Sequence, residues 1–203
     1  MRILSCLVLC LGCALAHAQD PAQVEAPSPK LGDQRLYRVI DGIGRQELRQ
    51  EDSVVTAVSA ERIEVTERNS GTVSVYDAAL ALLAVGDLQY KGRIEALQFP
   101  MSVGKRWTHR NEGQHASCGN TVSELKNTVN GWEDVKVPAG SFRALRIDSE
   151  GRWRNGCGSD RLQYKFWYVP ALRWLVRSES WSYASGRPYT AEIRELMSFK
   201  LAD

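Results

Sequence analysis

Apolar residues alternate with polar residues at every second position over long stretches of this chain. The run from Arg161 to Val169, RLQYKFWYV, is typical, because its branched and aromatic residues recur with period two. This period places successive side chains on opposite faces of a strand and leaves one face free for a core. The pattern therefore predicts an all-β fold. The predicted strands are Leu36–Asp41, Arg45–Val58, Arg62–Arg68, Thr72–Asp77, Lys105–Arg110, Asn120–Val137, Phe142–Trp153, Arg161–Val169, Arg173–Tyr183 and Tyr189–Leu201.

Short turn-forming sequences, such as Asn69-Ser70-Gly71, separate the predicted strands and favour antiparallel neighbours. A sheet of this many strands must curl to cover its apolar face. We therefore expect a curled antiparallel meander that forms an open or partly closed barrel. Residues 78–88, AALALLAVGDL, are ambiguous, because their alanines and leucines also suit a short helix or an irregular crossover.

The chain begins with the layout of a secretory signal peptide. Arg2 precedes an apolar stretch that ends near Ala16, and Ala16-His17-Ala18 has the small residues of a cleavage site. We expect residues 1–18 to be removed, which predicts a periplasmic or secreted protein. The stretch is shorter than the roughly 20 residues of a membrane-spanning helix, so we expect no transmembrane segment in the mature chain. A lipoprotein alternative would use Cys13, although Cys10 stands where such a signal has a branched aliphatic residue.

The sequence predicts two further parts after the signal. Residues 19–33 are rich in proline and poor in apolar residues, without periodicity, which is typical of a disordered linker. Residues 34–203 are long enough for a substantial core and are predicted to form a single antiparallel β domain.

The cysteines predict one disulfide. Three of the five belong to the signal peptide, so Cys118 and Cys157 remain in the mature chain. Two cysteines in an oxidising compartment most simply pair with each other. A metal site would have to add His109 and His115, which lack the close spacing of paired zinc ligands. We therefore predict neither a metal nor a cofactor.

The disulfide also predicts the topology. Val137-Pro138-Ala139-Gly140 suits a tight turn, with the fixed φ of proline followed by a glycine that tolerates positive φ. One reversal there brings the loops of Cys118 and Cys157 to the same end of the sheet. A hairpin at Asn130-Gly131, nominally the strongest hairpin signal, would separate them. We therefore expect Asn130-Gly131 to be a bulge or bend in one long strand.

The charge of the chain argues against nucleic-acid binding. Without Arg2, Lys and Arg number 25 against 24 Asp and Glu, a formal net charge of +1. Acidic and basic residues also interleave, as in Glu61-Arg62 and Glu67-Arg68, which is typical of solvated outer faces of strands rather than of a basic patch.

Three phrases in the C-terminal half resemble a known family. They are FPMSVGKRWTHR (residues 99–110), WEDVKVPAGSFRALRI (132–147) and FWYVPALRWLVRSE (166–179). Together they resemble an uncharacterised family of secreted bacterial β-sheet domains called TapB-like. The family usually has Pro-x-x-Gly where this chain has Pro170-Ala171-Leu172-Arg173, which implies a tighter or less flexible turn here. The resemblance implies a curved antiparallel sheet in the cell envelope and brings no activity or catalytic residue.

The sequence contains no catalytic motif of the nucleophile-elbow, zinc-helix or P-loop kind. The best candidate for a nucleophilic site is His109 or His115 near Ser117 or Cys118. A cysteine held in a disulfide is not a nucleophile, however, and a loop histidine is usually a solvated surface group. We therefore expect a non-catalytic protein, with a hydrolase that uses an unrecognised polar cluster as the alternative.

Aromatic residues near the C-terminus form the candidate ligand-binding set. Tyr164, Phe166 and Tyr168 share one face of a predicted strand, whereas Trp174 and Trp181 lie on opposite faces of the next. Most such residues are expected to be core, and stacking of outward arginines on tryptophans is the other structural explanation. The rest favour binding of an apolar or amphipathic ligand, such as a lipid, or of an envelope protein segment, in the concavity of the sheet. A third alternative is an adaptor that pairs through exposed sheet edges.

Overall fold

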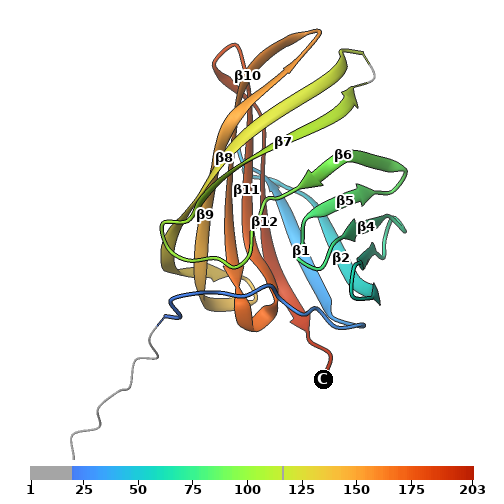
Figure 1. The fold of residues 1–203 in the computed structure, drawn as a ribbon, viewed down its shortest axis with the longest axis vertical. Coiled ribbons are helices and arrows are strands. Elements are labelled where there is room, and N and C mark those ends of the chain that lie inside the picture. The colour runs from blue at the N-terminus through green and yellow to red at the C-terminus, as the bar shows by residue number, and fades with distance from the viewer. Residues whose placement is uncertain (1–19, 116) are drawn as a thin grey trace, which may run out of the picture.

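Twelve antiparallel strands form one sheet that curls almost into a closed barrel (Figure 1). The computed structural model describes residues 20–115 and 117–203, so the predicted signal peptide and Cys13 lie outside the described residues. Strands that follow each other in sequence are paired, except β6 and β7, and the first strand also pairs with the last. The strands are β1 (Gln34–Asp41), β2 (Glu47–Val58), β3 (Ile63–Glu67), β4 (Val73–Tyr76), β5 (Leu82–Val85), β6 (Leu88–Ile94), β7 (Arg106–His115), β8 (Gly119–Val137), β9 (Gly140–Asn155), β10 (Gly158–Val169), β11 (Trp174–Ala184) and β12 (Arg187–Lys200).

The two edges of the sheet, β6 and β7, face each other without forming a ladder and leave an open seam. This arrangement confirms the predicted all-β, partly closed barrel. Within the described residues the one helical element is a 3₁₀ turn, Pro170–Leu172, between β10 and β11.

The short helix considered for residues 78–88 is wrong, because this stretch turns and then forms β5. The carboxylate of Asp77 accepts hydrogen bonds from the backbone N–H groups of Ala79 and Ala81, both at 2.9 Å. Such a side-chain bond stabilises a turn in competition with a helix. Leu80 adopts a positive φ of 61°, which ends any helical path, and Gly86 then joins β5 to β6 through a two-residue turn.

The long hairpin of β8 and β9 follows the predicted topology. The register shifts between Val129 and Gly131 while β8 continues for 19 residues, which confirms a bend rather than a hairpin at Asn130-Gly131. The chain reverses instead at Pro138-Ala139, where Val137 pairs with Gly140. Gly140 has a φ of 136°, which favours glycine.

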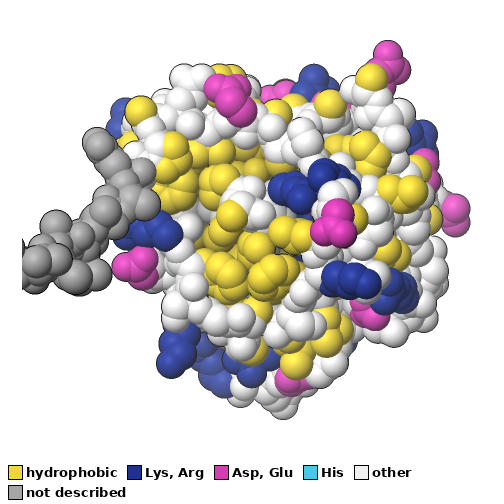
Figure 2. All heavy atoms as spheres, turned by 90° about the horizontal axis from the view of Figure 1, so that it is seen from below, with side chains coloured by type: hydrophobic (Ala, Val, Ile, Leu, Met, Phe, Trp, Pro, Cys, Tyr) yellow, Lys and Arg dark blue, Asp and Glu magenta, His cyan; other side chains and the backbone are white. Residues whose placement is uncertain are grey.

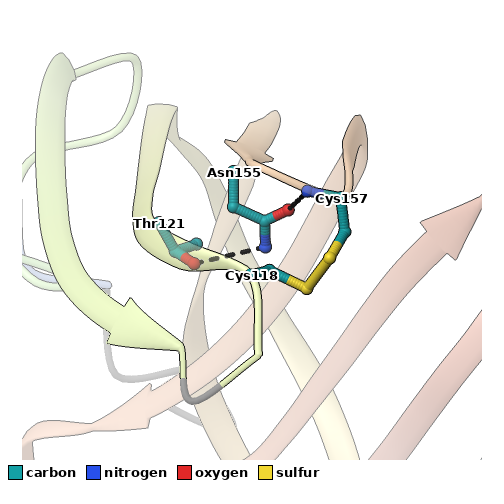
Figure 3. The surroundings of a disulfide bond; sticks show 4 residues. All are labelled: Cys118, Thr121, Asn155 and Cys157. Atoms are coloured by element: carbon teal, nitrogen blue, oxygen red, sulfur yellow. Dashed lines mark hydrogen bonds between the residues drawn. A yellow bond between two sulfur atoms is a disulfide. The ribbon is translucent and has the colours of Figure 1, made fainter.

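The predicted disulfide joins two loops at the opposite end of the sheet from this turn. Cys118 and Cys157 are bonded, with their Cα atoms 5.2 Å apart. The side chain of Asn155 lies beside the bond: its Oδ1 accepts from the backbone N–H of Cys157 at 2.9 Å, and its Nδ2 donates to Thr121 at 3.2 Å (Figure 3). The β7–β8 and β9–β10 loops are therefore held together at the upper end of the barrel.

The lower end of the barrel is closed by the segment before β1, which we call the N-terminal strap (residues 20–33; blue in Figure 1). Val24 is buried, and its backbone exchanges two hydrogen bonds of 2.7 Å with Met101 in the loop between β6 and β7. Asp20 also pairs with Arg143 of β9 at 2.6 Å. The expectation of a disordered linker is therefore wrong for these residues, because the loop supplies a partner that local composition does not reveal.

The core fills the lower half of the barrel, on the inner face of the sheet. Fully buried side chains come from both halves of the chain and include Tyr37, Val55, Met101, Ile147 and Leu196. Seen from below, hydrophobic side chains gather around the middle of this end of the molecule (Figure 2). The core and the strap thus leave the upper half of the inner face for a site.

Candidate functional site

Three of the predicted ligand-binding residues lie on the inner face of β10. Phe166 is directly opposite Ile147, and Tyr168 is opposite Leu145, both core residues of β9. The rings of Tyr164 and Phe166 are stacked, with centroids 6.1 Å apart. Tyr168 is only 1% exposed and meets Phe99 edge to face. Tyr168 is therefore a core residue, whereas Tyr164 and Phe166 stay partly accessible inside the barrel.

The two predicted tryptophans of β11 are separated by the sheet. Trp174 points inward, where the ring of Tyr76 from β4 meets it edge to face at 5.3 Å. Trp181 pairs with Ala191 and lies on the outer face, against Gly42. The structure therefore brings Trp174 to the interior with β10's aromatic residues and excludes Trp181 from any site there.

A cleft of about 500 Å³ opens on the inner face beside Trp174. Its walls come from β2, β3, β4, β11 and β12, so its residues lie far apart in the sequence. Tyr76, Trp174 and Val65 give it an aromatic and apolar floor. Serine hydroxyls and charged side chains surround this floor, among them Ser74, Glu51 and Arg194. The cleft is larger than the roughly 300 Å³ of the smallest ligand pockets.

The charged groups around the cleft are paired with one another. The guanidinium of Arg194 donates to Glu51 at 2.7 Å and lies over the ring of Tyr37, 3.6 Å from its centroid. Arg49 binds Glu192 through two hydrogen bonds of 2.9 and 3.1 Å. Because each cation has a carboxylate partner, the wall is polar without a strong net charge, which suits an uncharged or zwitterionic polar group.

The phenols inside the barrel are neutral at physiological pH. Burial raises the pKa of Tyr37 above its usual range, and it raises the pKa of Tyr76 in the same way. The hydroxyl of Tyr37 donates to the backbone oxygen of Leu175 at 2.7 Å. These tyrosines therefore act as apolar surfaces and hydrogen-bond donors rather than as acids or bases.

Arg35 lies behind the aromatic floor, with its guanidinium 4.7 Å from the ring centroid of Trp174. It is 2% exposed, and its Nε and Nη1 atoms have no hydrogen-bond partner in the described part of the chain. Its Nη2 contacts the backbone oxygen of Leu172 at 3.3 Å and Asp33 at 3.5 Å. Burial lowers the pKa of Arg35, but such a guanidinium remains charged. The guanidinium of Arg35 thus stacks on Trp174, a residue that also lines the cleft.

The hydrolase alternative predicted a histidine between a carboxylate and a hydroxyl, and His109 lacks that arrangement. It lies in β7 and is buried rather than solvated, and burial lowers its pKa. Its Nδ1 accepts from the side-chain amide of Asn127 at 2.9 Å, and that amide's oxygen accepts from the hydroxyl of Ser149. The amide separates the hydroxyl from the imidazole, so no base contacts a nucleophile. The side chain of His115 lies outside the described part.

Two further features are absent from residues 20–115 and 117–203. Within them, no three His, Cys, Asp or Glu side chains gather as they would around a metal ion. No helix in these ranges is long and apolar enough to cross a membrane.

The sequence did not reveal the residues on the far side of the cleft. Glu51, Tyr76 and Arg194 alternate with their neighbours in a period-two pattern, which places them on a face but not beside Trp174. Only closure of the sheet brings β4 opposite β11. The available signal was a pair of opposite charges that face inward, Glu51 on β2 and Arg194 on β12. Recognising this pair requires knowing the register of both strands.

Comparison with known proteins identifies the fold alone. No protein-family model matches the chain, and no curated protein does. The hypothetical lipoprotein YmcC from Escherichia coli is similar in structure, with a TM-score of 0.50 and 12% identity over 84% of this chain and 85% of that chain. An inferred lipoprotein from Parabacteroides distasonis has a TM-score of 0.50 and 13% identity over 90% of this chain and 100% of that chain. The resemblance to TapB-like domains stays a prediction from three phrases.

Proposed function

We propose that this chain is a non-catalytic protein of the bacterial cell envelope that binds a small amphipathic ligand in its inner cleft. An envelope location is supported by the signal-like start of the sequence and by a disulfide, which persists in oxidising compartments. The similarly folded proteins from E. coli and P. distasonis are both described as lipoproteins, which also supports such a location.

The cleft beside Trp174 carries the proposal. Its floor of Tyr76, Trp174 and Val65 suits an apolar chain or ring, and its ion-paired wall suits a polar head group. The stacked rings of Tyr164 and Phe166 continue the aromatic lining elsewhere on the inner face. His109, on the same inner face, contacts an amide rather than a nucleophile, and this supports binding rather than catalysis.

The first test is native mass spectrometry of the protein purified from its own periplasm, followed by binding of a fluorescent fatty acid as a probe. Ser74→Phe should fill the cleft and weaken binding of the probe at least tenfold. Ser198→Phe, at an exposed position of β12, is the matched control and should bind as the wild type does. Equal binding by Ser74→Phe and wild type, or no binding by either, would overturn the proposal.

Strand addition at the seam is the second candidate function. The free edges of β6 and β7 could each pair with an extended segment of a partner protein. A separate cleft of about 310 Å³ lies between these strands, and the buried Oδ1 of Asn111, on its wall, has no hydrogen-bond partner among the described residues. A stoichiometric protein partner in the mass spectrum, in place of a small adduct, would favour this adaptor function.

A further inference from the structure

The outer face of the sheet carries a second hollow, unrelated to the inner cleft. This outer groove has a volume of about 720 Å³ and runs over β7, β8, β9 and β10 near the disulfide-bonded end. Five cationic side chains line it against two carboxylates: the cations are Arg110, Lys126, Arg152, Arg154 and Arg161, and the carboxylates are Glu124 and Glu150. A local excess of positive charge therefore occurs on a chain whose charges are otherwise balanced.

The arginines of this groove are crowded together by the strand register. Arg152 of β9 is directly opposite Arg161 of β10 on one side and Glu124 of β8 on the other, and Arg154 is directly opposite Ser159. Residues directly opposite in an antiparallel pair have Cβ atoms roughly 5 Å apart and point to the same face. Because residues two apart on a strand also share a face, three guanidinium groups and one hydroxyl form a single patch, which we call the arginine patch.

The arginine patch lacks the ion pairs that neutralise arginines elsewhere on this barrel. In the described part of the chain, neither Arg152 nor Arg154 has a carboxylate oxygen within 4.0 Å, whereas Arg38, Arg146 and Arg177 each do. Arg161 lies over the ring of Tyr183, 4.2 Å from its centroid, and is not ion-paired either. The nearby carboxylate of Asp160 is occupied by the backbone N–H groups of Gly186 and Arg161.

Arg152 and Arg161 repel each other, because like charges placed directly opposite destabilise a sheet, and Glu124 on the other side of Arg152 does not come within 4.0 Å to offset this in the described part of the chain. A bound anion that accepts hydrogen bonds from both arginines would remove this repulsion. Guanidinium groups bind phosphate through paired, charge-assisted hydrogen bonds, and a phosphomonoester carries nearly two negative charges at neutral pH. A single carboxylate would leave most of the charge of three arginines uncompensated. The disulfide between Cys118 and Cys157, two residues before Ser159, holds this part of the hairpin in place.

We propose that the arginine patch is a binding site for a phosphate group, with Arg152, Arg154, Arg161 and Ser159 as its ligands. The phosphate belongs either to a soluble phosphorylated molecule or to a phospholipid head group. The site lies on the opposite face of the sheet from the Trp174 cleft, so it is independent of the function proposed above.

Isothermal titration with inorganic pyrophosphate, and flotation with vesicles containing phosphatidic acid, test the two sources. The variants are Arg152→Thr and Arg161→Thr, and the matched control is Arg106→Thr, which removes an exposed, unpaired arginine of β7. We expect each patch variant to weaken binding at least tenfold and the control less than twofold. Pyrophosphate binding indicates a soluble ligand, and vesicle binding alone indicates a lipid head group.

Thermal unfolding with and without pyrophosphate supplies a second readout. Pyrophosphate bound at the arginine patch should raise the melting temperature of the wild type but not that of Arg152→Thr, because only the folded wild type binds it. The proposal is overturned if neither probe binds, or if the control loses binding as the patch variants do. Ser74→Phe should bind phosphate as the wild type does. Failure of the phosphate-site proposal can therefore be told apart from failure of the inner-cleft proposal.

Discussion

At the scale of single residues, one buried carboxylate connects separate segments of the chain at the lower end of the barrel. Asp33 is fully buried and accepts hydrogen bonds from the backbone N–H of Ala202 at 2.9 Å and from Arg173 at 3.1 Å. Arg173 has a φ of 57°, a conformation that favours glycine. The ion pair of Arg173 with Asp33 offsets this backbone cost, and the sequence alone does not reveal it because the two residues lie far apart in the chain.

Replacement of Arg173 separates the two contributions. Arg173→Ala loses the ion pair and keeps an unfavourable backbone, so we expect a loss of about 3 kcal/mol in the free energy of unfolding. Arg173→Gly loses the same ion pair but relieves about 1 kcal/mol of backbone strain, so it should be the more stable of the two variants. Urea denaturation measures both. If the alanine variant is the more stable, the ion pair does not hold a strained residue.

At the scale of elements, alternation predicted ten of the strands, and β5 and β6 escaped it for different reasons. Residues 82–85 are a continuous apolar run, LLAV, which suits a buried strand and a helix equally. The sequence of β6, LQYKGRI, does alternate apolar and polar residues, but Gly92 interrupts the apolar positions and most of its side chains are exposed. β7 also extends further than predicted, through Asn111 to His115, because pairing with β8 rather than local pattern sets its length.

The close approach of β8 and β9 at Gly151 makes a prediction at this scale. A Cβ atom at Gly151 would overlap the backbone carbonyl oxygen of Glu124 and lie 2.9 Å from the Cα of Leu125. Because backbone atoms cannot move aside without breaking the ladder, Gly151→Ala should cost about 3 kcal/mol or more in the free energy of unfolding.

Gly113→Ala is the matched control for Gly151→Ala. Gly113 lies in β7, and an added Cβ there would meet nothing within 4 Å. We expect this variant to be as stable as the wild type or slightly more stable, since alanine restricts the unfolded chain. Equal denaturation midpoints for the two variants would show that β8 and β9 are not packed this closely at Gly151.

At the scale of the whole molecule, sequence reasoning predicted a curled sheet but not how its two ends differ. The upper end carries the disulfide, and the lower end is closed by the strap and the loop that contains Met101. The strap was predicted to be disordered because its composition is rich in proline. Its order depends on pairing of Val24 with Met101, which lies far away in sequence. Closure of this end leaves the seam and the upper half of the barrel for any ligand to enter.

Substitution in the strap tests whether this closure contributes to stability. Val24→Asp places an unpaired charge at a position that is 5% exposed. Either the folded protein is destabilised by the buried charge, or the strap detaches from the barrel so that the charge reaches water. If the strap detaches, the free energy of unfolding falls only by what the strap contributes. We expect this loss to be about 2 kcal/mol, the value of burying one valine together with its contacts. Gln23→Asp, at an exposed neighbouring position, should behave as the wild type. Limited proteolysis should cut within residues 20–33 only in Val24→Asp, and rapid cutting there in the wild type would show that the strap does not close the barrel.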